Sequence, residues 1–198
     1  SVEKLKNDFE EKLRIADVYE NLKKTANGEI VSDNSKITFE RYIMGSYFEQ
    51  VLYYANLRFS KMTGGRYEIV RGESRDKRIS AGLEISVRDN FNNKERDISS
   101  LSGGESFQAS LALALGLSDI IQQRNGGIRL DSIFIDEGFG SLDNDSLASA
   151  IETLNDLTGN GNRLVGIISH ISELKNSIGN KIEVVGTKSG SSIKIITD

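Results

Sequence analysis

The second half of the chain alternates helices with short apolar strands, and this order constrains the fold more than any other feature. Helical spacing of apolar residues runs from Ser106 to Gln122 and again from Asp145 to Leu157. Leu130–Ile135 and Leu164–Ile168 follow these helices in turn, and both are apolar runs of strand length. The alternation predicts an α/β fold with a mainly parallel sheet, flanking helices, and ligand sites at the carboxyl ends of the strands. We expect Leu164–Ile168 to be buried.

The first hundred residues follow other periods. Residues 1–26 carry a narrow apolar stripe among charged residues, which is typical of a coiled-coil arm and equally compatible with a helix packed on its own domain. A second helix is expected from about Thr38 to Arg58, capped by Ser35 or Thr38. Period-two alternation then predicts a small antiparallel meander with strands at Arg66–Arg71, Leu83–Asp89 and Glu95–Ile98. We therefore divide the chain into an arm, residues 1–26, and one lobe, residues 27–198.

Composition and charge exclude several classes of protein. The 198-residue chain has no cysteine, so disulfides and thiolate metal sites within it are excluded. No run approaches eighteen apolar residues, and the charged first stretch lacks the apolar core of a signal peptide. We therefore expect no membrane span and a cytoplasmic location. The formal net charge is −4, so any nucleic-acid contact has to come from a local basic patch.

One such patch lies between residues 58 and 78, where seven basic residues stand against three acidic ones. A solvated hairpin face explains this pattern as well as a DNA surface does, because runs of charge are usually exposed. The candidate DNA contacts are Arg58, Lys61, Arg66 and Arg71, and the patch continues with Arg75, Lys77 and Arg78.

The sequence Leu-Ser-Gly-Gly-Glu at Leu101–Glu105 stands directly before the apolar helix that starts at Ser106. A helix N-terminus carries unpaired N–H groups and a partial positive charge. Gly103 and Gly104 let the backbone approach an anion, because no Cβ stands in the way, and Ser102 adds a hydroxyl donor. Alone, the pattern fits an ordinary helix start as well as a phosphate site.

Polar residues also follow both apolar strands. The first strand runs into the adjacent carboxylates Asp136 and Glu137, which can divide the work of holding Mg²⁺ and orienting a water molecule. Ser141-Leu142-Asp143 follows shortly after. The second strand ends at His170, the only histidine of the chain, in the layer where the two acids should lie. That is a suitable position to sense a phosphate.

In this order and at these spacings, the elements resemble the ABC-type ATPases. Leu101–Glu105 matches their signature motif, Ser132–Glu137 their Walker B strand, Ser141–Asp143 their D-loop, and His170 their switch histidine. Within that superfamily the chain is similar to the C-terminal half of the ATPase head of the SbcC family, the large subunits of the SbcCD nuclease. The resemblance covers about residues 36–198 and includes LSGGESFQASLALALGLSD, DSIFIDEGFGSLD, GIISHISELK and FSKMTGGRYEIV.

The resemblance implies that two heads enclose two ATP molecules, with the signature of one head closing over the γ-phosphate held by the other. Leu101–Glu105 would form this trans nucleotide site, with Ser102, Gly103 and Gly104 on the phosphate. The D-loop residues, Asp143 above all, would link the two sites: Ser141, Leu142 and Asp143. Glu105 stands where most transporter ATPases carry glutamine, which favours the DNA-repair branch.

The same resemblance implies the residues that act in cis. Asp136 would support Mg²⁺ through water, Glu137 would be the catalytic base that orients the attacking water, and His170 would contact the γ-phosphate. ATP binding would close the heads and hydrolysis would open them. The implied output is control of a partner nuclease that acts on DNA.

The sequence contains no G-x-x-x-x-G-K-[ST] phosphate loop. In the SbcC family this loop lies in a distant N-terminal segment beyond a long coiled coil, so the resemblance implies one lobe of a split head. The implied partners are the N-terminal lobe, a second head, a nuclease subunit and DNA. We expect ATP hydrolysis only when the N-terminal lobe completes the head, and an inactive lobe otherwise.

Two alternatives stay open from the residues. A head fragment of an SMC-like or RecN-like ATPase would share the split head, the signature and the two acids. A DNA-tethering module with a vestigial ATP site is a different class, and the intact pair Asp136 and Glu137 argues against it. A transporter ATPase is disfavoured by the missing phosphate loop.

Overall fold

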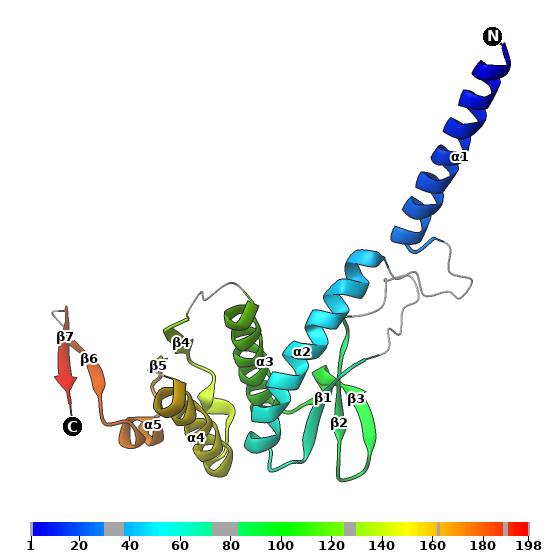
Figure 1. Cartoon of the computed structure of the whole chain (residues 1–198). Helices are drawn as coiled ribbons and strands as arrows, with labels where there is room; N and C mark the ends of the chain where they lie inside the picture. Colours follow the sequence, from blue (N-terminus) through cyan, green and yellow to red (C-terminus); the bar gives the residue numbers. More distant parts are fainter. Residues whose placement is uncertain are drawn as a thin grey trace.

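The computed structural model describes residues 2–29, 38–72, 83–124, 130–161, 163–187 and 190–197. A single helix, α1 (Val2–Ala26), projects from a body of helices and small sheets (Figure 1). None of its residues is buried. The helix ends before Gly28, whose positive φ of 71° suits a glycine after a helix. The helix is thus confirmed, and its pairing into a coiled coil stays a prediction.

The second helix, α2 (Phe39–Met62), is one turn longer than the sequence indicates. It begins at Thr38, whose side chain accepts a hydrogen bond from the backbone N–H of Arg41 at 3.3 Å. Ser35, the other candidate cap, lies outside the described residues. One face of the helix is buried at helical spacing, and its buried apolar side chains are Val51, Leu52, Ala55, Phe59 and Met62.

This face packs on α3 (Gly103–Arg124), the helix that follows the Leu-Ser-Gly-Gly-Glu stretch. The two helices approach each other closely at Gly116. A Cβ at that position would lie 2.7 Å from the carbonyl oxygen of Val51 and 2.7 Å from the backbone nitrogen of Ala55. Only glycine therefore permits this spacing.

The predicted antiparallel meander is confirmed. Its strands are β1 (Tyr67–Arg71), β2 (Ile85–Asp89) and β3 (Lys94–Asp97), paired in that order. Asn56 of α2 ties the meander to the helix, because its side chain bonds both the backbone N–H and the carbonyl of Ile69, each at 2.8 Å. A short 3-10 turn, η1 (Ile98–Ser100), then leads into α3.

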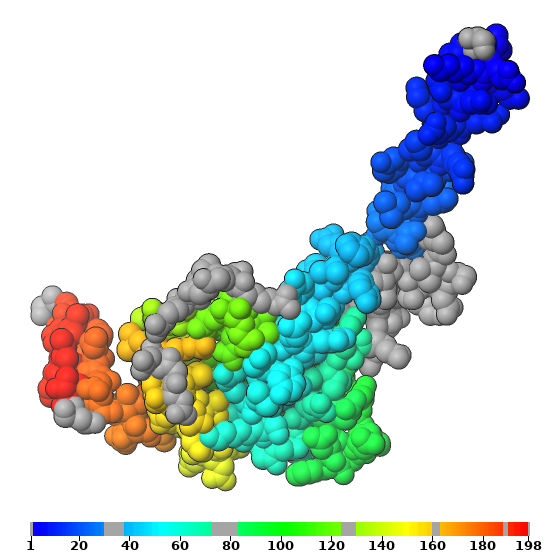
Figure 2. Space-filling view, in the orientation of Figure 1, coloured from blue at the N-terminus to red at the C-terminus, as the bar shows by residue number. Residues whose placement is uncertain are grey.

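The predicted parallel pairing is formed by β4 (Ser132–Asp136) and β5 (Leu164–Ile168), with Asp136 opposite Ile168. The remaining elements are η2 (Phe139–Ser141), α4 (Asn144–Gly161), α5 (Ser172–Ser177), and the antiparallel hairpin β6 (Lys181–Thr187) and β7 (Gly190–Ile196). The space-filling view shows this hairpin at the opposite end of the molecule from α1 (Figure 2). The α/β fold class is confirmed.

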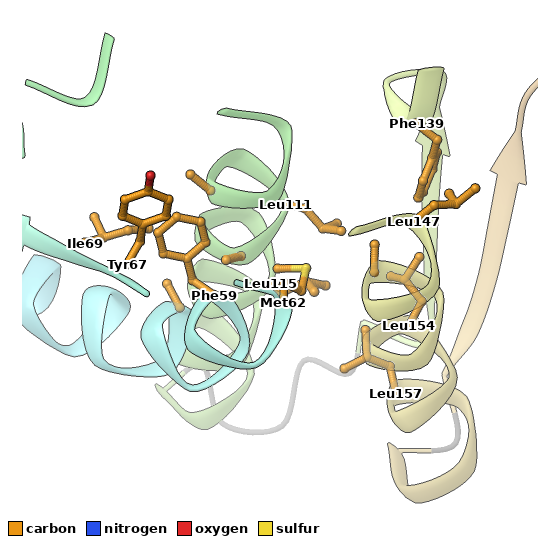
Figure 3. Close-up of a cluster of buried hydrophobic side chains, with 14 of the residues drawn as sticks. Phe59, Met62, Tyr67, Ile69, Leu111, Leu115, Phe139, Leu147, Leu154 and Leu157 are labelled. Carbon is orange, nitrogen blue, oxygen red and sulfur yellow. The ribbon is translucent and has the colours of Figure 1, made fainter. Parts of the chain in front are cut away.

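The hydrophobic core joins α2, the meander, α3, the parallel strands, α4 and α5 into one body. Figure 3 shows side chains of α2, β1 and α3 on one side and side chains of η2 and α4 on the other. The labelled members are Phe59, Met62, Tyr67, Ile69, Leu111, Leu115, Phe139, Leu147, Leu154 and Leu157. Phe107 of α3 meets Phe139 edge to face, with ring centroids 4.8 Å apart. The core therefore connects α3 directly to the segment after β4.

The expectation that Leu164–Ile168 is buried was wrong. Leu164 and Ile168 are 64% and 56% exposed, and Phe134 on the neighbouring strand is 69% exposed. Val165 and Ile167, which alternate with them, pack against the core. The sheet has two strands within the described ranges, and one face lacks a covering layer there. Apolar strands with an open face are typical of a sheet completed by other chain segments.

Candidate functional site

The Leu101–Glu105 stretch lies at the N-terminus of α3, as predicted. The Ser102 hydroxyl oxygen accepts a hydrogen bond from the backbone N–H of Glu105 at 3.3 Å. In return, the Glu105 carboxylate accepts the backbone N–H of Ser102 at 2.9 Å. This reciprocal pair is a capping box. It holds an exposed serine hydroxyl at the positive end of a 22-residue helix, where an anion is favoured.

Tyr67 of β1 lies near Glu105, and both residues line one pocket. Burial by itself would raise the pKa of Glu105, but hydrogen bonds from the Ser102 backbone N–H and the Tyr67 hydroxyl outweigh it and lower the pKa. Burial raises the pKa of Tyr67, and its hydrogen bond to Glu105 raises that pKa further. Tyr67 is therefore neutral, and Glu105 is a charged acceptor whose hydrogen bonds come from its own chain.

The predicted D-loop packs directly on the signature stretch. A Cβ at Gly104 would lie 2.8 Å from the carbonyl oxygen of Ser141, so glycine is needed for this contact as well as for any anion. The Ser141 hydroxyl donates to the carbonyl of Gly138 at 3.0 Å. Leu101 and Leu142 are half-buried and pack against the core. These two leucines anchor the motifs, and the polar residues beside them stay accessible.

Asp143 has a structural role that the sequence analysis missed. Its carboxylate accepts the backbone N–H of Ser146 at 2.8 Å, at the start of α4. This backbone hydrogen bond is the main cause that lowers the pKa of Asp143. The exposed aspartate of the D-loop is thus fixed by the helix that follows it.

Glu137 and His170 meet at the carboxyl ends of the two parallel strands. The His170 Nδ1 lies 3.1 and 3.2 Å from the two carboxylate oxygens of Glu137. Asp136, the last residue of β4, is exposed at the same edge. An ionised carboxylate only accepts hydrogen bonds, so the contact places a hydrogen on Nδ1 and leaves Nε2 for another partner. The His170 and Glu137 side chains are 82% and 49% exposed.

The backbone at Glu137 adopts an uncommon conformation. Its φ is 60°, a left-handed value, and Gly138 follows with a φ of 98°. The Glu137 N–H still donates to the carbonyl of Ile168 at 2.9 Å, which extends the parallel ladder by one residue. A methyl group at Gly138 would overlap the ring of Phe107 on α3. The turn that directs Glu137 is therefore held by packing from the signature helix.

A polar pocket of about 410 Å³ opens beside these motifs. Its lining combines the end of α2 and the meander with the signature stretch and the D-loop, including Arg66, Tyr67, Ser102, Glu105 and Asp143. The signature and D-loop residues predicted separately from the sequence thus share one cavity wall.

The four candidate DNA contacts each form ion pairs within the chain. Arg58 lies 2.8 Å from Asp119 and Arg66 lies 3.3 Å from Asp89. Lys61 contacts Glu152 at 3.0 Å and Asp156 at 2.7 Å, and Arg71 contacts Glu49 at 2.6 Å. Arg75, Lys77 and Arg78 lie outside the described residues. These pairs reduce the local positive charge, and DNA contact through this patch stays a prediction.

Sequence reasoning also missed Tyr67, Arg96 and Phe107 as neighbours of the motifs. The Ser-x-x-Glu spacing from Ser102 to Glu105 is a recognised capping signal and could have been used. Nothing local marks Tyr67 and Phe107, because their contacts with Arg96 and Phe139 join residues far apart in the chain.

Solved structures support the class of protein. A structure from work on ATP-driven dimerization and DNA stimulated activation of SMC ATPases matches with a TM-score of 0.61 and 14% identity. The match covers 79% of this chain and 89% of that one. At this identity the likeness defines the fold alone, which is that of an SMC-type, ABC-type ATPase head.

The family follows from sequence. Residues 73–156 match the SbcC/RAD50-like Walker B family. The SbcC protein of the SbcCD nuclease from Vibrio cholerae is 49% identical over 87% of this chain, and its counterpart in Staphylococcus epidermidis is 55% identical over 77%. The chain belongs to the SbcC family, as its motifs indicated. It spans only 17% and 15% of the length of these two relatives.

No helix among the described residues is long and apolar enough to cross a bilayer. Within the same residues, no three histidine, cysteine or acidic side chains gather as a metal site. Asp136 and Glu137 nevertheless suit Mg²⁺, which prefers one or two carboxylates and takes its other ligands from water and substrate phosphates.

Proposed function

We propose that this chain is the C-terminal half of a split ATPase head in a DNA double-strand-break repair nuclease complex. The observation that carries the proposal is the contact between Glu137 and His170. These residues are 33 positions apart, and they meet at 3.1 Å at the ends of neighbouring parallel strands. ATP hydrolysis needs an acceptor for the proton of water and a group on the γ-phosphate within reach of one another.

In this proposal Glu137 orients the attacking water and accepts its proton. Asp136 would hold Mg²⁺ through water, and the bound ion would supply positive charge beside the phosphate oxygens. A neutral His170 that donates Nδ1–H to Glu137 has only a lone pair at Nε2, which repels phosphate. His170 therefore reaches the γ-phosphate either as imidazolium or by turning Nδ1–H away from Glu137. Either event changes the contact between His170 and Glu137, the proposed base, when nucleotide binds.

The split head accounts for the exposed apolar surfaces. The open face of β4 and β5 would be covered by the N-terminal lobe that carries the phosphate loop. The α1 helix would be the base of a coiled-coil arm, and residues 27–198 would form the lobe. Ser102, Gly103 and Gly104 would contact the γ-phosphate held by a second head, and the closed dimer would regulate a partner nuclease on DNA in the cytoplasm.

The test is Glu137→Gln in the complete head. Because glutamine keeps the shape and loses the base, we expect ATP binding to persist and turnover to fall by about 10²- to 10⁴-fold. Glu173→Gln, an exposed glutamate on the neighbouring α5, is the matched control and should keep wild-type turnover. Radiolabelled ATP binding and phosphate release measure the two quantities. Wild-type turnover in Glu137→Gln would refute the assignment of the base.

A further inference from the structure

The meander reaches the signature serine through side chains that belong to no motif. Arg96 of β3 donates through Nη2 to the Tyr67 hydroxyl at 3.1 Å, and its guanidinium carbon lies 5.3 Å from the centre of the tyrosine ring. The same guanidinium donates through Nη1 to the carbonyl of Ser100 at 3.0 Å. Ser100 is two residues before Ser102, so Arg96 holds both the tyrosine hydroxyl and the backbone that enters the signature.

The directions of these hydrogen bonds form a continuous series. A tyrosine hydroxyl has one hydrogen to donate and lone pairs to accept with. Arg96 occupies an acceptor position of the Tyr67 hydroxyl, so the tyrosine fixes the same guanidinium that binds the carbonyl of Ser100. Glu105 accepts the backbone N–H of Ser102 at 2.9 Å. The order is Tyr67, Arg96 and the carbonyl of Ser100, and Ser102 follows two residues later with its backbone N–H on Glu105.

This arrangement determines how Ser102 is presented. Its oxygen already accepts the N–H of Glu105 at 3.3 Å, so its own hydroxyl hydrogen can be donated outward from an exposed side chain. Charge-assisted hydrogen bonds to a carboxylate are short and directional, which limits the movement of the backbone they hold. Loss of the Tyr67 hydroxyl would release one side of Arg96 and loosen the backbone that leads to the serine, without touching any nucleotide.

We propose that Tyr67 and Arg96 are positioning residues that set the signature serine for its phosphate contact through the backbone at Ser100. This inference rests on the proposed function, because the contact is the trans contact to ATP bound by a second head. It assigns to the meander a role in head closure, and it assigns to Glu105 the role of holding Ser102 rather than of touching ATP.

The deciding variant is Tyr67→Phe in the full-length protein. Phenylalanine keeps the buried ring, which is 2% exposed and stacks on Phe59 with centroids 6.3 Å apart. Only the hydroxyl is lost. We expect ATP-driven association of heads to weaken about tenfold, the order of one hydrogen bond to a charged group. ATP binding to the unassociated head should not change. Tyr53→Phe, on an exposed tyrosine of α2, is the matched control.

Arg96→Lys and the double variant test the series itself. Lysine keeps the charge but lacks the two-pronged donor that joins Tyr67 to Ser100. If the residues act in one series, the double variant should lose about as much association as the single variant with the larger loss. Independent effects would instead add. Additive losses, or association of Tyr67→Phe at the wild-type level, would overturn the proposal.

Ser102→Arg separates this inference from the proposed function. Arginine would fill the phosphate position, so ATP-driven association should be abolished. If Ser102→Arg associates normally, the trans contact itself is wrong. If Ser102→Arg fails to associate and Tyr67→Phe equals wild type, the trans contact stands and only the positioning role is wrong. A lower melting temperature of Tyr67→Phe with unchanged association would show a merely structural tyrosine.

Discussion

The signature end of α3 and the strand edge at Glu137 differ in how far the described residues complete them. Ser102 and Glu105 satisfy each other in a capping box, and Ser141 closes on Gly104 from the side. At the strand edge, Glu137 contacts an exposed histidine, and the sheet behind it has an open apolar face.

The difference follows from what each region has to bind. A helix N-terminus can be preorganised by its own backbone, cap and neighbours, so the signature that we propose to act on another head would need little further ordering. A sheet edge takes its shape from all the strands of the sheet. We therefore expect the signature end to keep its geometry in the lobe alone and the strand edge to sharpen when the N-terminal lobe docks.

The largest expected effect comes from breaking the ion pairs that join α3 to α2 and to the start of β5. Asp119 of α3 pairs with Arg58 of α2 at 2.8 Å and with Arg163, just before β5, at 3.0 Å. Its side chain is 13% exposed. Asp119→Ala leaves two largely buried guanidinium groups without their carboxylate and should lower the free energy of unfolding by about 3–5 kcal/mol.

Urea denaturation of the complete head measures this loss. Asp156→Ala is the control, because it removes an aspartate from an exposed pair with Lys61 and should cost under about 1 kcal/mol. Equal losses in the two variants would mean that the Asp119 cluster does not hold α3 against α2 and the start of β5.

The next effect comes from disturbing the contact between the signature helix and the turn at Glu137, which should leave the protein folded. Gly138→Ala introduces a side chain at a φ of 98° and against the ring of Phe107. It should cost about 2 kcal/mol of stability and, by shifting Glu137 by about 1 Å, lower turnover about 10²-fold. Steady-state ATPase assays and thermal melting report the two quantities.

Gly159→Ala is the matched control for this glycine. Gly159 lies in α4 with nothing near its missing Cβ, so alanine should stabilise the helix by up to about 1 kcal/mol. Turnover should not change. A Gly138→Ala variant with normal turnover would show that the turn after β4 does not need its observed backbone to direct Glu137.

The sequence predicts the local elements well because their causes are local. Helices α1 to α4 follow from apolar spacing, and the cap at Thr38 follows from residue type. The convergence of Glu137 and His170 follows from a general rule, since the carboxyl ends of adjacent parallel strands share one edge.

The remaining features depend on residues far apart in the chain. The pairing of Arg58 with Asp119 spans 61 positions, and no local pattern indicates it. The open face of β5 was missed for a related reason: an apolar strand has the same pattern whether or not another segment covers it. Tyr67 looks like any alternating strand residue until the fold places it beside Glu105.

The smallest expected effect concerns Asp143, where the D-loop meets α4. The backbone N–H of Ser146 lowers the pKa of Asp143 in the folded state. Its stabilising contribution is therefore complete above the unfolded pKa of about 4 and is lost as the pH falls through the lower folded pKa. Asp143→Asn keeps a good helix cap without a titrating group.

Wild type should therefore melt somewhat above Asp143→Asn at pH 7, and this advantage should shrink as the pH falls below about 4. All other carboxylates are common to both proteins, so the difference between the curves isolates this group. If the advantage of wild type grows in acid, the carboxylate does not cap α4. The signature end would then be held less firmly by contacts within its own chain, and its contrast with the strand edge would be smaller.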